Sequence, residues 1–297
     1  MHSNKGNNFN LMNKIGEVDI ELDNYLQESK LIMDSWEKNN EKYLMQKYKN
    51  YHSVIQTFLK FYLMSINLSI YRTKESWTEK EAMLTGISTI NFWRFRASYL
   101  LFKKGYPVES ICLLRGIYEN ILTITALLRN ILDIKNIFSE ISPTIDLSDK
   151  NLVKKKLKDG TFKLSKKVKE NIIGKKSPLS LETQNFFNTI FEIMHDSVHR
   201  SMINIVRFVF PWYQGKKVLF PLPLFEDAFL IVNMDLSLDL AWIIINFLPK
   251  IYEKGINEIK LFRDSYNLMN KSFIQILNNN KCKKFIEEFI QSIQYKL

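Results

Sequence analysis

Three apolar stretches of this 297-residue chain each carry two polar residues four positions apart. The pairs are Arg115 with Glu119, His195 with His199, and Asp235 with Asp239. A spacing of four places both side chains of a pair on one face of a helix, one turn apart. If these groups meet in a cleft, they can do acid–base chemistry or bind a phosphate. From these pairs we nominate Arg115, Glu119, His195 and His199 as candidate catalytic residues.

The same pairs also have a purely structural interpretation. The neighbours of Arg115 and Glu119, in CLLRGIYENILTITALL, are nearly all apolar, which predicts that this pair is buried. Buried charge is costly unless partners satisfy it, so the three pairs could complete one another as an internal network, together with Arg94 or Arg96. Both interpretations require the pairs to meet at a common point inside the molecule.

A metal site is a third interpretation. His195-x-x-x-His199 offers a ligand pair on a helix, and Glu192-x-x-His195 is half of a di-iron bundle motif. The second Glu-x-x-His is missing, and Asp196-x-x-His199 resembles it poorly. No HExxH, CxxC, Walker, GxGxxG or GxSxG motif occurs. We therefore predict neither a metal nor a cofactor.

Helices must position these residues. The chain has only 9 Gly and 7 Pro, with all prolines at or after Pro107, and shows no strand pattern. Apolar periodicity predicts helices over about 17–38, 41–73, 79–104, 107–135, from after Pro178 to Pro211, and over 224–248, with one or two amphipathic helices at the end. We expect an all-α single bundle of seven to nine helices.

Two local signals define a helical hairpin. Thr78 with Glu81 fits a capping box and predicts a helix start. Gly105 suits the left-handed position that ends a helix, and Pro107 suits the first turn of the next one. The helices over 79–104 and 107–135 should therefore be antiparallel. Pro249 is expected to end the helix over 224–248.

The positive charge of the chain is concentrated in one segment. The net charge is +11, and residues 147–178 hold eleven lysines against Asp149, Asp159 and Glu170. This segment is either a solvated connector or an arm that contacts phosphates. The second interpretation nominates Lys154, Lys155, Lys156, Lys166 and Lys167 as nucleic-acid-binding residues. We divide the chain into a flexible tail over 1–16 and a bundle over 17–297 that carries this basic insertion or connector.

Arginine is scarce, at eight of 42 basic residues. Six of the eight lie in apolar helical segments: Arg94, Arg96, Arg115, Arg129, Arg200 and Arg207. A fixed planar fork is a reason to use arginine in a lysine-rich chain.

Compartment signals favour the cytoplasm. Two cysteines form no disulfide framework, and the N-terminus has no signal-peptide pattern. The apolar stretch 228–248 holds Asp235 and Asp239 near its middle, which favours a buried core helix over a membrane-spanning one.

Residues 97–130 resemble a bacterial all-helical family of unknown function. The matching positions are Ala97, Gly105 and the Arg115-x-x-x-Glu119 element, and a later SVHRS segment with His199 matches the family's Ser–His element. The match covers about 95–210. The family is distantly similar to the HEPN superfamily, whose members include metal-independent ribonucleases of bacterial toxin and phage-defence systems. That superfamily cleaves with R-x4–6-H on one helix, whereas here Arg200 and Arg207 follow the histidines.

The leading hypothesis is a HEPN-like protein that binds or cleaves RNA in a bacterial stress, toxin or phage-defence role. His199 or His195 would take the proton of a ribose 2′-OH, and Arg115 or Arg200 would stabilise the phosphate. Glu119 would orient Arg115 or His199. Expected partners are RNA, a second copy of the chain or a partner protein of a defence system, with no membrane. The rival hypothesis is a non-catalytic interaction or regulatory module.

Overall fold

The structure is a computed structural model that describes most of the chain. It covers residues 34–72, 78–133, 165–199, 227–252, 259–277 and 282–294, the single residues Gln27 and Leu31, and the stretches 212–213 and 216–217. The expected tail over 1–16 lies outside the described residues, as do positions 147–164 of the basic insertion.

The described chain is helical, with one very short hairpin. Residues 34–47 and 165–172 form two helical segments. The other helices are α2 (Lys49–Arg72), α3 (Glu79–Lys104), α4 (Pro107–Leu128), α7 (Leu181–His199), α9 (Asp227–Ile251), α10 (Lys260–Leu277) and α11 (Lys283–Gln294). Strands β1 (Trp212–Tyr213) and β2 (Lys216–Lys217) pair antiparallel. Nine helical segments within the described residues confirm the expected all-α bundle.

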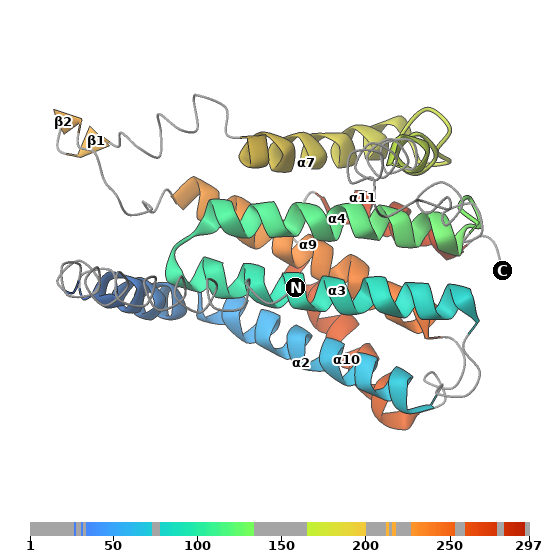
Figure 1. The fold of residues 1–297 in the computed structure, drawn as a ribbon, viewed down its shortest axis with the longest axis horizontal. Coiled ribbons are helices and arrows are strands. Elements are labelled where there is room, and N and C mark those ends of the chain that lie inside the picture. Colours follow the sequence, from blue (N-terminus) through green and yellow to red (C-terminus); the bar gives the residue numbers. More distant parts are fainter. Residues whose placement is uncertain are drawn as a thin grey trace, which may run out of the picture.

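The predicted hairpin of α3 and α4 is confirmed. The backbone N–H of Thr78 donates to the Glu81 carboxylate (2.8 Å), and the Glu81 N–H donates to the Thr78 hydroxyl (3.2 Å), which completes the capping box. Gly105 has φ 92°, where a side chain would be strained, and Pro107 begins α4. Figure 1 shows the two helices running side by side in opposite directions.

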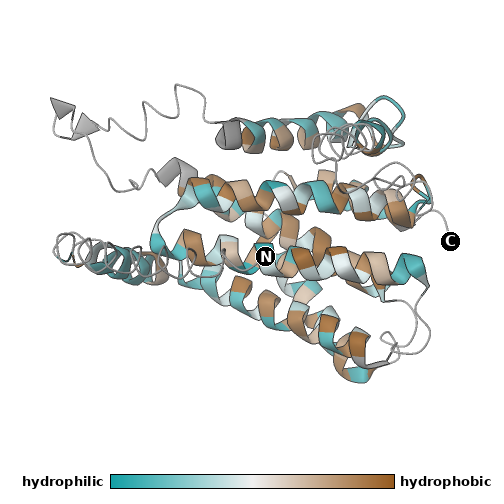
Figure 2. Cartoon of the chain, viewed as in Figure 1, coloured by the Kyte–Doolittle hydropathy of each residue, from teal (hydrophilic) through white to brown (hydrophobic). Residues whose placement is uncertain are grey.

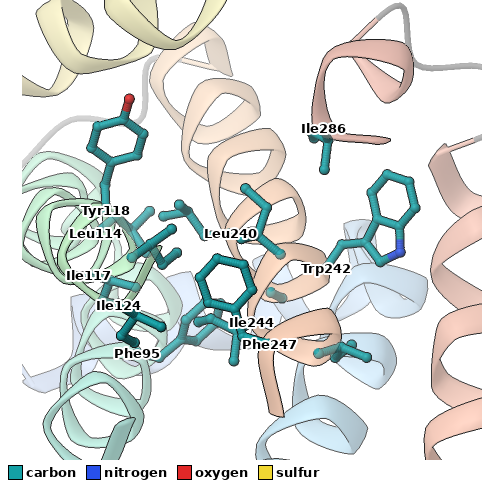
Figure 3. Packing of buried hydrophobic residues seen from close by; sticks show 14 of the residues in the cluster. Phe95, Leu114, Ile117, Tyr118, Ile124, Leu240, Trp242, Ile244, Phe247 and Ile286 are labelled. Atoms are coloured by element: carbon teal, nitrogen blue, oxygen red, sulfur yellow. The ribbon is translucent and has the colours of Figure 1, made fainter. Parts of the chain in front are cut away.

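Helix α9 is the centre of the core. It contacts α2, α3, α4, α10 and α11, and residues 240–245 are all buried, so this part of the helix is covered on every side. Figure 3 shows Tyr118 of α4, Phe95 of α3 and Ile286 of α11 around this helix, which contributes Phe247 to the same core. The outer helices α2, α3 and α7 mix apolar and polar residues in Figure 2, as amphipathic helices do.

Within the part of the chain that the structure describes, two helices are long and apolar enough to cross a membrane, by length and composition alone. They are α4 and residues 230–251 of α9, and more than half of the most apolar part of each is buried inside the bundle. The core helix of a folded domain passes the same test. The burial around α9 agrees with the expectation that 228–248 is a core helix.

Three expected helix boundaries were wrong. The break expected between 38 and 41 falls at Tyr48 instead, and Asn40 lies within a helix, where its amide donates to the Lys104 carbonyl (3.5 Å) at the end of α3. Helix α4 ends at Leu128 rather than 135, because Asn130 takes a left-handed conformation (φ 55°). Pro249 lies inside the last turn of α9 instead of ending it.

Candidate functional site

The Arg115–Glu119 pair lies at the surface of α4, which corrects the prediction that it is buried. Arg115 Nε donates to Glu119 Oε1 at 3.0 Å, and the side chains are 17% and 49% exposed. The apolar neighbours Leu114, Ile117 and Tyr118 point into the core and leave this stripe of the helix outside. The mostly apolar sequence of this segment therefore did not show that one stripe of the helix faces solvent.

Arg115 also contacts an aromatic ring of α7. Its guanidinium carbon lies 5.4 Å from the centre of the Phe191 ring, and Nζ of Lys169 lies 4.2 Å from the same ring centre. The imidazole of His195 stacks on Phe191, with ring centres 5.8 Å apart and an angle of 19° between the planes. Phe191 and His195 are half-buried. We call Arg115, Lys169, Phe191 and His195 the Phe191 cluster.

Packing between α4 and α7 sets the position of this cluster. The buried Tyr118 hydroxyl donates to the Phe187 carbonyl at 2.9 Å, and the Tyr118 ring contacts the Phe191 ring. Phe187 lies one turn before Phe191 on α7, so the anchored turn carries Phe191 and His195 to the outer edge of the interface. The structure thus brings two predicted site residues, Arg115 and His195, to one ring.

Other predicted residues are described only in part. Helix α7 ends at His199, whose side chain lies outside the described residues, as do Arg200, Lys154, Lys155 and Lys156. Lys166 and Lys167 are exposed on the 165–172 helix, which also carries Lys169. Lys166 and Lys167 were nominated from the sequence, whereas Lys169 and Phe191 were missed. Apolar periodicity assigns Phe191 to the core side of its helix and does not show that its ring is partly exposed.

Arg94 and Arg96 stay apart from the Phe191 cluster. Nη1 of Arg94 donates to the Gly116 carbonyl at 2.9 Å and so ties α3 to α4. A Cβ added at Gly116 would lie 2.8 Å from that nitrogen, so a side chain there would displace the Arg94 guanidinium from the Gly116 carbonyl. Arg96 is exposed and its guanidinium carbon lies 5.6 Å from the Trp93 ring centre.

The Asp235–Asp239 pair lies elsewhere, so the prediction that the three pairs meet at one point was wrong. Asp235 is exposed and lines a cavity of about 320 Å³ with Lys47 and Tyr51. Asp239 is only 5% exposed, and its Oδ1 has no hydrogen-bond partner within the part of the chain that the structure describes. One-turn spacing placed both residues on one side of α9, but the neighbouring helices decided which of them is covered.

Burial and charge both act on the Asp239 carboxyl. Burial raises its pKa to about 7, and the nearby Asp235 carboxylate adds to the rise. Burial, with the same two carboxylates, also raises the pKa of the Cys282 thiol at the start of α11 to about 11. No three His, Cys, Asp or Glu side chains gather closely enough to hold a metal among the described residues.

Comparisons with known proteins identified no relative of this chain. No protein-family model matches the chain, and no curated protein or solved structure matches it. The resemblance to HEPN-like proteins therefore stays a prediction from sequence motifs, and function must be argued from the geometry.

Proposed function

We propose that the protein binds single-stranded RNA at the Phe191 cluster. One observation carries this proposal: Arg115 and Lys169, from two different elements, both lie over the ring of the half-buried Phe191. An aromatic ring can stack on a base while flanking cations contact the backbone phosphates, and this combination is typical of single-strand binding.

The surroundings support a polyanionic ligand. Lys166 and Lys167 are exposed on the same helix as Lys169, and the exposed Lys175 follows it. Lysines at the surface contact phosphates without reading base identity, so we expect a salt-dependent affinity with little sequence preference.

The catalytic form of the proposal gives His195 and Arg115 separate roles. His195 takes the proton of a ribose 2′-OH, and the 2′-oxygen attacks the adjacent phosphorus. The bond to the 5′-oxygen breaks, and that oxygen takes a proton from water, which leaves a 2′,3′-cyclic phosphate and a 5′-hydroxyl. Arg115 stabilises the charge on the phosphate, and Glu119 holds Arg115. His199 and Arg200 stay sequence-based candidates for the same roles.

A structural role is the second candidate, and it also has an observation behind it. Glu119 and the Phe191 ring already engage the Arg115 guanidinium, as they would in a pair that only joins α4 to α7. In that case the protein is a non-catalytic interaction module. The role in bacterial stress, toxin or phage defence, and association with a second copy or a partner protein, stay predictions.

Titration of a labelled single-stranded RNA, followed by fluorescence anisotropy, tests the proposal. We expect Lys169→Ala to weaken binding about tenfold and to reduce the salt slope by about 1. Phe191→Leu should also weaken binding by about tenfold, because it removes a stacking surface while keeping apolar volume. Lys284→Ala is a matched control, since Lys284 lies 4.6 Å from the Phe285 ring centre on α11 and should leave binding unchanged.

Two results decide between the candidates. Equal RNA affinity of the wild type and Lys169→Ala would reject the Phe191 cluster as an RNA site. RNA cleavage that is lost in His195→Ala, with an unchanged melting temperature, supports the catalytic form. Wild-type protein that binds RNA without cutting it would leave RNA binding in place and reject that form.

A further inference from the structure

A second site lies away from the Phe191 cluster, in a cavity between the end of α4, the 165–172 helix, the segment before α7, and α11. Its volume is about 530 Å³, within the range that holds a small organic molecule. The lining residues are Arg129, Ile131, Asn171, Lys176, Pro178, Leu179, Glu288, Gln291 and Ser292. We call it the Arg129 cavity. None of the described residues that were nominated from the sequence as site residues lines it.

Arg129 brings to this cavity a buried guanidinium nitrogen that has no hydrogen-bond partner among the described residues. This arginine follows the last residue of α4, and the nitrogen is its Nη1. Burial lowers the pKa of the guanidinium, but an arginine keeps its charge at neutral pH. Buried donors are nearly always hydrogen-bonded, and a charged one left alone is costly, so this nitrogen points to an anionic partner.

Glu288, the one carboxylate among the described residues that line the cavity, is already engaged. Glu288 accepts hydrogen bonds from the Ser180 backbone N–H (2.5 Å), from the Ser180 hydroxyl (2.8 Å) and from the Thr183 hydroxyl. Burial alone would raise the pKa of Glu288, but these hydrogen bonds and the Lys284 charge outweigh it and lower the pKa. Glu288 is therefore ionised and accepts hydrogen bonds at the start of α7. Its carboxylate is thus not available to neutralise Arg129.

The remaining walls offer further donors and an apolar surface. Lys176 supplies a second cation, and the Gln291 and Asn171 amides can donate. The Asn171 amide nitrogen already donates one hydrogen bond to the Lys167 carbonyl at 2.8 Å, and the Ser292 hydroxyl donates to the Phe289 carbonyl at 2.7 Å. Ile131, Pro178 and Leu179 form the apolar part of the lining.

The segment before α7 is held in place, so the cavity is preformed. The Ser177 hydroxyl donates to the Ile172 carbonyl (2.6 Å) and accepts from the Leu179 N–H (3.2 Å). The Gln184 amide then donates to the Leu179 carbonyl at 2.8 Å. Walls fixed in this way reduce the entropy lost when a ligand binds.

We propose that the Arg129 cavity binds a small organic phosphate, with its phosphate group on Arg129 and Lys176 and its carbon skeleton against Ile131, Pro178 and Leu179. Two cations match a phosphate monoester, which carries nearly two negative charges, better than a single carboxylate. The described residues that line this cavity include none of the Phe191 cluster. The site would thus be separate from the one that we propose for RNA.

Isothermal titration calorimetry of the full chain tests the proposal with four probes. Adenosine 5′-monophosphate and ribose 5-phosphate are organic phosphates of suitable size, and inorganic phosphate and adenosine each represent one part of them. We expect at least one organic phosphate to bind more tightly than inorganic phosphate, and adenosine not to bind. Arg129→Gln should weaken that binding at least tenfold, because it removes charged hydrogen bonds.

Controls keep this outcome distinct from the RNA proposal. Arg96→Gln, at an exposed arginine of α3, should leave phosphate binding unchanged, and so should Lys169→Ala. Arg129→Lys retains the charge and should bind more tightly than Arg129→Gln, and thermal melts confirm that each variant is folded. Binding of inorganic phosphate alone, no binding by any probe, or equal binding by wild type and Arg129→Gln would overturn the proposal.

Discussion

Arg129 and Asp239 present the same physical problem in two regions of the fold. Each is a side chain that carries charge in water, and each has a buried polar atom without a hydrogen-bond partner in the described part of the chain. Arg129 lies beside a cavity at the end of α4, whereas Asp239 lies inside the packing of α9. Leaving such a group unsatisfied costs free energy in both places.

The two residues differ in what can relieve that cost. Asp239 can take a proton, and burial has already raised its pKa to about 7. Arg129 cannot give up its proton near neutral pH, so its buried nitrogen needs a hydrogen-bond acceptor, and an anion is the strongest one. A buried acid thus points to a pH dependence of stability, and a buried arginine beside a cavity points to a ligand.

Asp239→Asn should produce the largest change. The folded-state pKa of about 7 lies above the ordinary value of 3.8, so between these pH values the native state holds a proton that the unfolded chain has lost. The free energy of unfolding should therefore fall by roughly 4 kcal/mol as pH rises from about 4 to 7, then level off. Asp239→Asn should remove most of this fall, as measured by urea unfolding at pH 5 and pH 8.

Asp235→Asn is the control for that experiment. It removes the neighbouring charge that adds to the raised pKa of Asp239, but it leaves Asp239 buried. We expect the fall in stability to begin at the same pH, near the unfolded-state pKa, to end at a lower pH, and to be smaller but still large, because burial is the main cause of the raised pKa. An unchanged pH dependence in Asp239→Asn would show that Asp239 is not the titrating group.

Arg129→Met should change the free energy of unfolding by less, and should raise it, whereas an ordinary core mutation lowers it. Methionine keeps the apolar stem and removes the unsatisfied donor, so we expect the ligand-free protein to gain about 1–2 kcal/mol in unfolding free energy. Urea unfolding measures this, with Arg96→Met as the matched exposed control. A loss of stability would mean that the folded chain already satisfies the Arg129 guanidinium.

Arg115 and Glu119 should give the smallest effect. Because Glu119 is 49% exposed, we expect a coupling energy of about 0.5 kcal/mol from a double-mutant cycle of Arg115→Ala and Glu119→Ala. A buried pair would instead lose about 3–5 kcal/mol when one partner is removed. A loss of that size would restore the buried network that the sequence had suggested.

Two predictions that depend on residues within one helical turn are confirmed. The capping box at Thr78 and the Gly105–Pro107 break depend on a few adjacent residues, and both are present as predicted. Asn40 and Pro249 were misjudged, because helix packing kept both inside helices although each disfavours one. Propensity is a weak signal when tertiary contacts oppose it.

The amino-acid order alone was enough to establish an all-helical bundle and the antiparallel pairing of α3 with α4, since periodicity and caps are local properties. It also placed each polar pair on one face of its helix. Which faces are covered depends on residues distant in the chain: Tyr118 and Phe187 bring His195 to Arg115, while the packing of α9 covers Asp239 and leaves Asp235 exposed. Burial, and with it the pKa of Asp239 and the lack of a partner for Arg129 Nη1 among the described residues, is a property of the assembled fold.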